Sequence, residues 1–406
     1  MPATALRCTH CHAEHALEAI GACPRCFAPL EPVYDPEELA RSATRERMAA
    51  GPPSLWRYAP LLPVEPPAAP RLAPGLTPLV RAPRLAEAVG VRDLWLKLDI
   101  ANPTHSFKDR VVAVACAKAL ELGLTTLACS STGNLANAVA ARAAAEGLEA
   151  AVFCPADLEP EKLVATAVYG ATVYAVDGTY DDCSRLTVEL SFELPSWAFV
   201  NVGLRTYYAE GSKTLAYEIA EQLGWRTPSA VVVPIASGAL FSRVRRGFEE
   251  LADLGLVADL RPRLFGAQAE GCSPVAAAFA EERRVVPVRP QTAARSLAIG
   301  SPADGDAAVE AARASGGAVY AVAEEEVGAN MALLAERAGV FGETAAGVAV
   351  GALLEAVRRG ELGEEDEVVL LVTGDGLKTP EPVAGSLRPV EVEADADALL
   401  ERLIAA

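Results

Sequence analysis

One lysine lies in a sequence context that suits a reactive amine. Lys108 belongs to the run NPTHSFKDR, residues 102–110. Ser106, followed three residues later by Asp109, predicts a helix start similar to a capping box, with Lys108 in the first turn. The positive end of a helix dipole disfavours an ammonium ion there, and an imine-forming lysine needs a neutral amine. An ordinary surface lysine at a helix start is the alternative.

Two further segments each combine an apolar strand, a loop of small residues and a helix start. In SSTGN, residues 130–134, hydroxyls, a glycine and an amide precede an Ala-rich helix, so backbone N–H groups could bind an anion. The loop ASGAL, residues 236–240, has the same layout and could hold a phosphate through main-chain donors. An ordinary connection between strand and helix is the alternative for both.

A fourth segment, LLVTGDGLKTP, ends an apolar strand at a threonine. The hydroxyl of Thr373 could face a nitrogen of a bound ring, and a Gly-rich turn follows it. A plain turn is the alternative. None of the four segments decides the chemistry by itself.

The cysteines fall into two groups. Cys8-x2-Cys11 and Cys23-x2-Cys26 are separated by eleven residues, a spacing typical of zinc ribbons. Four thiolates leave no open position on the metal, so we expect a structural zinc site, the alternative being a knuckle without bound metal. We expect reduced, mostly buried thiols at the other five positions, which are Cys116, Cys129, Cys154, Cys183 and Cys272.

Composition limits the class of protein. The chain has 406 residues, 51% of them hydrophobic, which is enough for two or three packed units and argues against disorder. The formal net charge is -18, which argues against a broad nucleic-acid or anionic-membrane surface. We find no apolar stretch typical of an export signal or a membrane span, so we expect a cytoplasmic protein.

The segments around these residues predict an α/β fold. Residues 52–78 are dense in proline and predict an extended wrap or linker. Beyond them, short apolar runs alternate with helical stretches, which is typical of open, doubly wound parallel sheets. The predicted strands are 94–98, 125–131, 150–155, 171–176, 230–235, 263–269 and 367–374.

In this order, the four segments resemble the threonine synthase branch of the tryptophan-synthase-β-like, or fold type II, pyridoxal-phosphate (PLP) enzymes. NPTHSFKDR is similar to the lysine segment of that branch, SSTGN to its Ser-Thr-Gly-Asn loop, and TGDGLKTP to its late Thr-Gly-x-Gly-Leu-Lys-x-Pro motif. The cysteine-rich start followed by PLEPVYD is similar to the N-terminus of many members. The likeness extends from about residue 8 to residue 385.

The resemblance implies a domain division. It comprises a zinc-ribbon-like segment (1–34), a large PLP-binding α/β domain (35–118 and 205–385), a smaller α/β domain (119–204) and a C-terminal tail helix (386–406). Together these amount to two doubly wound open sheets with a ribbon at the N-terminus. A homodimer is expected by analogy with this fold.

The resemblance also implies residue roles. Lys108 would carry PLP as an imine and then act as acid and base. The amide of Asn134 would lie on the 3-hydroxyl of the cofactor, and Thr373 would pair with the pyridine nitrogen. The full set of implied cofactor contacts is Phe107, Lys108, Asn134, Ala236, Ser237, Gly238, Ala239, Leu240 and Thr373. The implied substrate contacts are Ser131, Thr132 and Gly133 for the carboxylate and Arg205 for the phosphate.

Three positions depart from the family pattern. His105 stands where the family often has glycine. The loop ASGAL lacks the Asn and Gly residues that are common there, and Arg205 lies earlier than the usual spacing before Glu210 and Gly211. The resemblance therefore says least about the contacts of the phosphate loop and of the substrate arginine.

The reaction implied is a PLP-dependent γ-elimination followed by β-replacement, which turns O-phospho-L-homoserine and water into L-threonine and phosphate. A threonine or serine dehydratase, or a paralogue acting on another activated amino acid, is the alternative within the same fold. A zinc-ribbon binding protein that recruits nucleic acid or a partner is the alternative outside it, and the acidic composition disfavours it.

Overall fold

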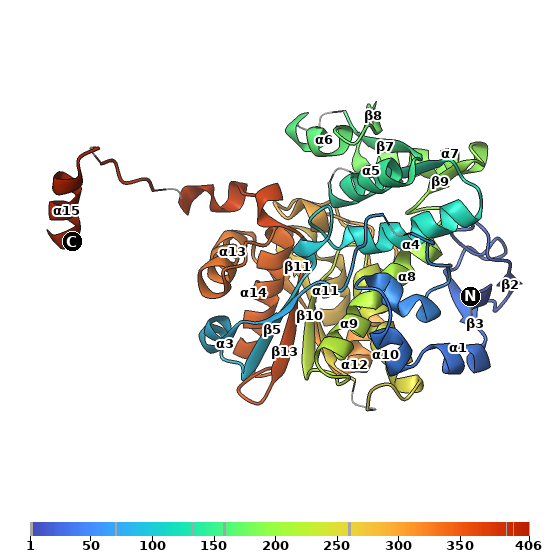
Figure 1. Ribbon diagram of the computed structural model, residues 1–406, viewed down its shortest axis with the longest axis horizontal. Coiled ribbons are helices and arrows are strands. Elements are labelled where there is room, and N and C mark those ends of the chain that lie inside the picture. The colour runs from blue at the N-terminus through green and yellow to red at the C-terminus, as the bar shows by residue number, and fades with distance from the viewer. Residues whose placement is uncertain are drawn as a thin grey trace.

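Three sheets organise the chain in the computed structural model (Figure 1). The structure describes residues 3–69, 71–131, 133–156, 160–258, 261–386, 388–392 and 394–405. A six-stranded sheet has the order β12-β11-β10-β13-β5-β4, a four-stranded sheet the order β8-β7-β6-β9, and a three-stranded sheet the order β2-β1-β3. The α/β class with two open sheets is thereby confirmed.

The six-stranded sheet is parallel except for the pairing of β4 with β5. Its strands are β4 (Leu79–Arg81), β5 (Asp93–Leu98), β10 (Ala230–Pro234), β11 (Arg263–Ala269), β12 (Ala318–Val322) and β13 (Glu367–Val372). All residues of β10 and β13 are buried, because helices cover both faces of the sheet. The predicted strands at β5, β10, β11 and β13 are confirmed, whereas β12 and the edge strand β4 were not predicted.

Two hydrophobic cores flank this sheet. One packs α3 (Pro83–Val89), α13 (Glu324–Ala338) and α14 (Thr344–Arg358) against it. The other packs α9 (Thr214–Gln222), α10 (Ala239–Asp253), α11 (Pro274–Ala280) and α12 (Gly305–Ser315) against the opposite face. Such a doubly wound sheet leaves the carboxyl ends of its strands as the accessible edge for a ligand.

The four-stranded sheet is fully parallel. Its strands are β6 (Thr126–Ser130), β7 (Glu149–Pro155), β8 (Thr172–Val176) and β9 (Trp197–Phe199). The helices in this part of the chain are α4 (Lys108–Glu121), α5 (Asn134–Glu146), α6 (Pro160–Ala167), α7 (Tyr180–Glu193) and α8 (Arg205–Glu210). Figure 1 shows this sheet above the larger one, with α4 running between the two. The predictions at β6, β7 and β8 are confirmed.

The N-terminal strands form a separate small antiparallel sheet. They are β1 (Ala3–Cys8), β2 (Glu14–His15) and β3 (Leu30–Tyr34), and α1 (Pro36–Ser42) and α2 (Arg45–Ala49) follow them. Most described residues of the proline-rich stretch after these helices form no helix or strand, as its composition predicts, but one part of the stretch is regular. It contains the 3-10 helix η1 (Leu55–Leu61), where the apolar side chains Leu55, Trp56 and Tyr58 are buried and hold the segment on the core.

Short 3-10 helices complete the fold. They are η2 (Asp99–Ala101), η3 (Gly211–Lys213), η4 (Glu270–Cys272), η5 (Arg295–Leu297), η6 (Gly376–Lys378) and η7 (Glu381–Ser386). The terminal helix α15 (Ala396–Ala405) lies well apart from the body in Figure 1. Among the described residues, no helix combines the length and apolar character needed to cross a membrane.

Candidate active site

The lysine segment and the late-threonine segment meet at the carboxyl edge of the larger sheet. β13 pairs in parallel with both β5 and β10, so the loops that follow these three strands emerge side by side. The backbone N–H of Phe107 donates to the carbonyl oxygen of Thr373 at 2.9 Å, and the N–H of Asp375 donates to the carbonyl of His105 at 3.1 Å. Tertiary pairing of two distant loops therefore positions Lys108.

The start of α4 differs from the sequence prediction. The helix begins at Lys108 with Phe107 as its N-cap, and no side chain caps it. Ser106 instead forms a β-bridge with Gly374, and its buried Oγ has no hydrogen-bond partner among the described residues. The carboxylate of Asp109 accepts from the N–H and the hydroxyl of Thr104, at 2.7 and 2.9 Å. The predicted capping-box-like pair is wrong, because both residues are used by the neighbouring loops.

The amine of Lys108 faces two aromatic side chains. Its Nζ donates to the hydroxyl of Tyr208 at 2.9 Å and lies 4.6 Å from the centre of the Phe107 ring. Tyr208 comes from α8, a hundred residues away, and sequence reasoning did not single it out. The only available signal was its place in the run RTYYAEG, just after Arg205.

Asn134, the first residue of α5, is held between two charged side chains. Its Nδ2 donates to Glu343 Oε2 at 3.0 Å, and its Oδ1 accepts from Lys378 Nζ at 2.7 Å. Glu343 precedes α14 and is 3% exposed, and burial raises the pKa of its carboxyl. Sequence reasoning missed both partners, although Lys378 belongs to the TGDGLKTP run.

The loop after β6 uses the backbone donors of its described residues within the protein. Ser131 is buried, its N–H bonds the carbonyl of Phe153 at 3.1 Å, and its hydroxyl accepts from the N–H of Gly133 at 3.3 Å. A Cβ at Gly133 would meet no atom within 4 Å, so open space adjoins the loop. Thr132, which the sequence also assigns to the substrate carboxylate, lies outside the described residues.

The loop after β10 has the geometry of an anion cradle. Gly238 is the N-cap of α10 with a φ of +91°, and a Cβ there would collide with the carbonyl of Asp304. In the described part of the chain, the N–H groups of Leu240 and Phe241 have no backbone partner. Unpaired N–H groups at the start of a long helix favour a bound anion.

Arg205, the first residue of α8, lies beside this cradle. Its Nη2 is 2.5 Å from Asp304 Oδ2, and the backbone N–H of Asp304 donates to the carbonyl of Ser237 at 2.8 Å. About 30% of the arginine side chain is exposed. The guanidinium is thus paired with a carboxylate next to the phosphate-type loop.

A second charged cluster lies buried around Arg110 of α4, the last residue of the lysine segment. Arg110 donates to both carboxylate oxygens of Asp99, at 2.7 and 2.8 Å, and to both oxygens of Glu218. Lys97 Nζ is 2.6 Å from Glu218 Oε2, and the side chains of Lys97, Arg110 and Glu218 are completely buried. We call Lys97, Asp99, Arg110 and Glu218 the Arg110 network.

The four paired cysteines converge at the N-terminal sheet. Their sulfur atoms all lie within 4.8 Å of one another, with Cys8 Sγ 3.4 Å from Cys26 Sγ and Cys11 Sγ 3.6 Å from Cys23 Sγ. This donor set could hold a metal ion. The other five cysteines are buried and free, as predicted.

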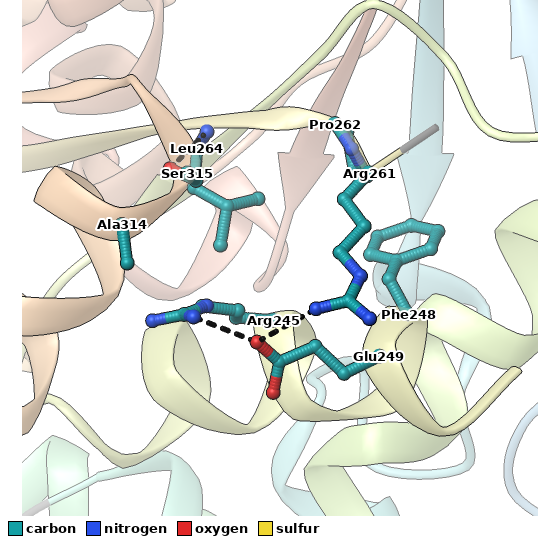
Figure 2. Close-up of a pocket in the computed structure, with 8 residues that line it drawn as sticks. All are labelled: Arg245, Phe248, Glu249, Arg261, Pro262, Leu264, Ala314 and Ser315. Atoms are coloured by element: carbon teal, nitrogen blue, oxygen red, sulfur yellow. Dashed lines mark hydrogen bonds and ion pairs between the residues drawn. The ribbon is translucent and has the colours of Figure 1, made fainter. Parts of the chain in front are cut away.

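Two cavities lie away from the predicted cofactor and substrate residues. Figure 2 shows the smaller, of about 40 Å³, where Arg245 and Arg261 face the carboxylate of Glu249 from α10. The larger, of about 520 Å³, lies between the N-terminal sheet and α10 and includes Cys8 and Tyr34 in its wall. Neither includes the predicted cofactor or substrate residues.

Comparison with known proteins finds a matching family and relatives that are similar over most of the chain. Residues 71–374 match the family described as pyridoxal-phosphate dependent enzyme. The chain is 33% identical over 398 residues to the threonine synthase of Methanocaldococcus jannaschii, covering 97% of this chain and 98% of that protein. It is 35% identical over 403 residues to the threonine synthase of Methanosarcina acetivorans, covering 98% of each.

A solved structure gives the same fold. An L-serine ammonia-lyase from Rhizomucor miehei matches with a TM-score of 0.64 and 21% identity, covering 74% of this chain and 93% of that one. At this level of identity the match concerns the fold alone.

Proposed function

The chain belongs to the family of pyridoxal-phosphate-dependent enzymes and to its threonine synthase branch, and on that premise we propose that it converts O-phospho-L-homoserine and water to L-threonine and phosphate. The observation that carries the proposal is the position of Lys108. Its amine lies where the lysine segment is hydrogen-bonded to the Thr373 segment, at the carboxyl edge of the six-stranded sheet. The loop after β10, which forms the anion cradle, lies at the same edge. The carboxyl edge of a doubly wound sheet is where such folds bind ligands.

The residues present fit the cofactor. Gly238 and the unpaired N–H groups at the start of α10 suit the phosphate of PLP. Lys108 offers the amine, and Thr373 a neutral hydroxyl that could pair with the pyridine nitrogen. The buried Oγ of Ser106, which no described residue bonds, is a polar group that a ligand could satisfy.

The bound cofactor supplies an electron-withdrawing ring that stabilises negative charge on the α-carbon of an amino acid. The amine of Lys108 would take protons from the α- and β-carbons as the phosphate leaves, and would return one proton to the γ-carbon and, once water has added at the β-carbon, one to the α-carbon; the remaining proton leaves with the phosphate. Tyr208, 2.9 Å from that amine, would hold it in place between transfers. A proton carrier must lie within hydrogen-bond reach of the atom that it serves, and the start of a rigid helix keeps Lys108 in a defined position.

Substrate recognition would come from two loops. Ser131, Thr132 and Gly133 would bind the carboxylate, which would have to compete for the N–H groups of Ser131 and Gly133 because both are hydrogen-bonded within the protein. Release of phosphate needs a cation at the other end of the substrate, and Arg205 is the proposed group. Because Arg205 is paired with Asp304, the substrate phosphate would have to compete for or share the guanidinium.

Three further properties are proposed. Zinc at Cys8, Cys11, Cys23 and Cys26 would be structural, supported by the convergence of the four sulfur atoms. A homodimer is proposed from the habit of the fold. Cytoplasmic location stays the prediction made from the sequence.

The test compares two product assays on the purified protein. Phosphate release from O-phosphohomoserine should exceed ammonia release from threonine by orders of magnitude. Rapid oxo-acid formation from threonine without phosphate release would instead assign a dehydratase.

A Lys108→Ala variant separates the enzyme proposal from binding functions. It should lose both turnover and the absorbance of covalently held cofactor at about 410–420 nm. Lys118→Met, at the other end of α4, is the matched control and should keep both. Full activity in Lys108→Ala would refute the role of this lysine.

A further inference from the structure

Lys378 lies where three segments of the chain meet. Its ammonium donates to the carbonyl oxygen of Thr104 at 2.6 Å and to Asn134 Oδ1 at 2.7 Å. Thr104 belongs to the loop that leads to Lys108, Asn134 begins a helix of the four-stranded sheet, and Lys378 ends η6 beyond Thr373. The ammonium therefore joins the two sheets at the point where the cofactor residues converge.

The partners of Asn134 determine which way its amide points. An ammonium has only donors, so the atom that faces Lys378 must be the carbonyl oxygen. The carboxylate of Glu343 only accepts, so the atom that faces it must be the NH₂ group. If the amide were flipped, its NH₂ group would face the ammonium of Lys378 and its carbonyl oxygen would face the carboxylate of Glu343. Neither pair could form a hydrogen bond, and unsatisfied polar groups are costly in such a site.

One donor of the Asn134 amide remains after these two bonds are made. The NH₂ group has two hydrogens, and only one hydrogen bond from it, to Glu343, is formed with a described residue. A fixed amide with a spare N–H is suited to an oxygen acceptor, and above all to an anionic one.

The orientation depends on the charge of Lys378. Burial lowers the pKa of this lysine, while Glu343, Asp109 and Asp375 oppose that change. Glu343 in turn faces Asn134, Lys378, Ser296 and Lys108. A deprotonated lysine can accept a hydrogen bond, so the constraint on the amide is lost when Lys378 becomes neutral.

We propose that Lys378, together with Glu343, is a positioning residue that locks the Asn134 amide with its N–H toward the ring oxygen of the cofactor. This rests on the proposed function, in which Asn134 contacts that oxygen. The lock stabilises the anionic form of the ring oxygen, and it is set before substrate arrives.

The experiment measures cofactor binding and spectrum without substrate. Lys378→Met should weaken PLP binding by about tenfold, the loss expected for a charge-assisted hydrogen bond. It should also move the pH midpoint of the cofactor absorbance, which a purely structural lysine would not affect. Lys378→Arg keeps a cationic donor, so the spectrum of this variant should stay close to that of the wild-type protein. If Lys378→Met fails to fold, Lys378→Arg and Glu343→Gln still report on the same midpoint.

A double-variant cycle tests whether the effect passes through Asn134. In an Asn134→Ala background, Lys378→Met should cause no further loss of PLP affinity and no further shift of the midpoint. Equal effects of Lys378→Met in both backgrounds would overturn the inference, as would an unchanged midpoint in the single variant. Lys118→Met, which removes a buried lysine paired with Glu121, is the control and should leave the spectrum unchanged.

The result is distinguishable from a failure of the proposed function. A wild-type protein that binds PLP but releases no phosphate from O-phosphohomoserine would refute the substrate assignment and leave the spectral test readable. A protein that makes threonine normally while Lys378→Met keeps the wild-type midpoint would refute only the orientation role.

Discussion

Two charged clusters adjoin the lysine segment, one completely buried and one partly buried, and they differ in how completely their hydrogen bonds are satisfied. In the Arg110 network, the five N–H groups of the guanidinium are fully used by Asp99, Glu218, Thr77 and Thr214. The amide of Asn134, between Lys378 and Glu343, keeps one N–H that forms no hydrogen bond with a described residue. The first cluster has nothing left to offer a ligand, and the second has.

This difference separates residues that hold the site from residues that form it. The Arg110 network contains two cations and two anions, so its burial is compensated internally. Around Asn134, Glu343 interacts with Lys378 and with Lys108, the proposed cofactor lysine. We therefore expect losses in the first cluster to appear as instability, and losses in the second to appear as lost chemistry.

The largest effect is expected at Lys108. Lys108→Ala should reduce turnover of O-phosphohomoserine by at least about 10³-fold, because its amine is the proposed proton carrier. Thermal unfolding of the cofactor-free form should change little, since among the described residues the amine of Lys108 forms a hydrogen bond only with Tyr208. A large fall in the cofactor-free melting temperature would place Lys108 with the structural cluster instead.

The next effect is expected at Arg110. Arg110→Met leaves the carboxylates of Asp99 and Glu218 buried without their main cation, which should lower the free energy of unfolding by about 3–5 kcal/mol. Chemical denaturation measures the loss, and the cofactor spectrum of the folded fraction should be unchanged. A spectral shift without destabilisation would contradict the division between the two clusters.

The same network predicts acid sensitivity. Burial opposes ionisation of Glu218, but Arg110 and Lys97 outweigh it and lower the pKa of the carboxyl to about 2. Because this pKa is depressed in the folded state, the stabilisation is fully present above the ordinary value of 4.5 and is lost as the pH falls toward about 2. Denaturation midpoints measured across this range should fall less steeply in Glu218→Gln.

Much of the fold could be predicted because its signals are local. The strands at β10 and β13 are short apolar runs that are buried on both faces, and such runs stand out in a sequence. Gly238 and Lys108 could be assigned from the resemblance of their segments. Their roles in binding and chemistry stay predictions until they are tested.

The rest depended on contacts between distant segments. Ser106 looks like a helix cap, yet it pairs with Gly374, and that bridge moves the helix start to Lys108. Tyr208 and Glu343 reach the site from α8 and from the start of α14, and neither lies in a motif that marks it. Local patterns cannot reveal which side chains the sheet edges bring together.

A smaller effect is expected at the anion cradle. Gly238→Ala places a Cβ against the carbonyl of Asp304 at a φ of +91°, a strain of about 1–3 kcal/mol. PLP affinity should fall accordingly, and free phosphate should compete less well with PLP. Gly255→Ala, at a positive φ but with no atom within 4 Å of its Cβ, is the control for backbone strain alone. Equal losses of PLP affinity in both variants would argue against a cradle at Gly238.

The smallest effect is expected for an ion pair that is neither buried nor near the site. On α7, Arg185 lies 3.0 Å from Asp182 and 3.4 Å from Glu189, with 66% of its side chain exposed. Water and salt screen such pairs, so Arg185→Ala should leave both the denaturation midpoint and the cofactor spectrum unchanged within error. If it destabilised the protein as much as Arg110→Met, burial would not be what distinguishes the Arg110 network. Arg185 and Arg110 each pair with two carboxylates, so the number of charge pairs would then explain the loss of stability in both variants. The inference that saturated hydrogen bonds mark a structural role would fail.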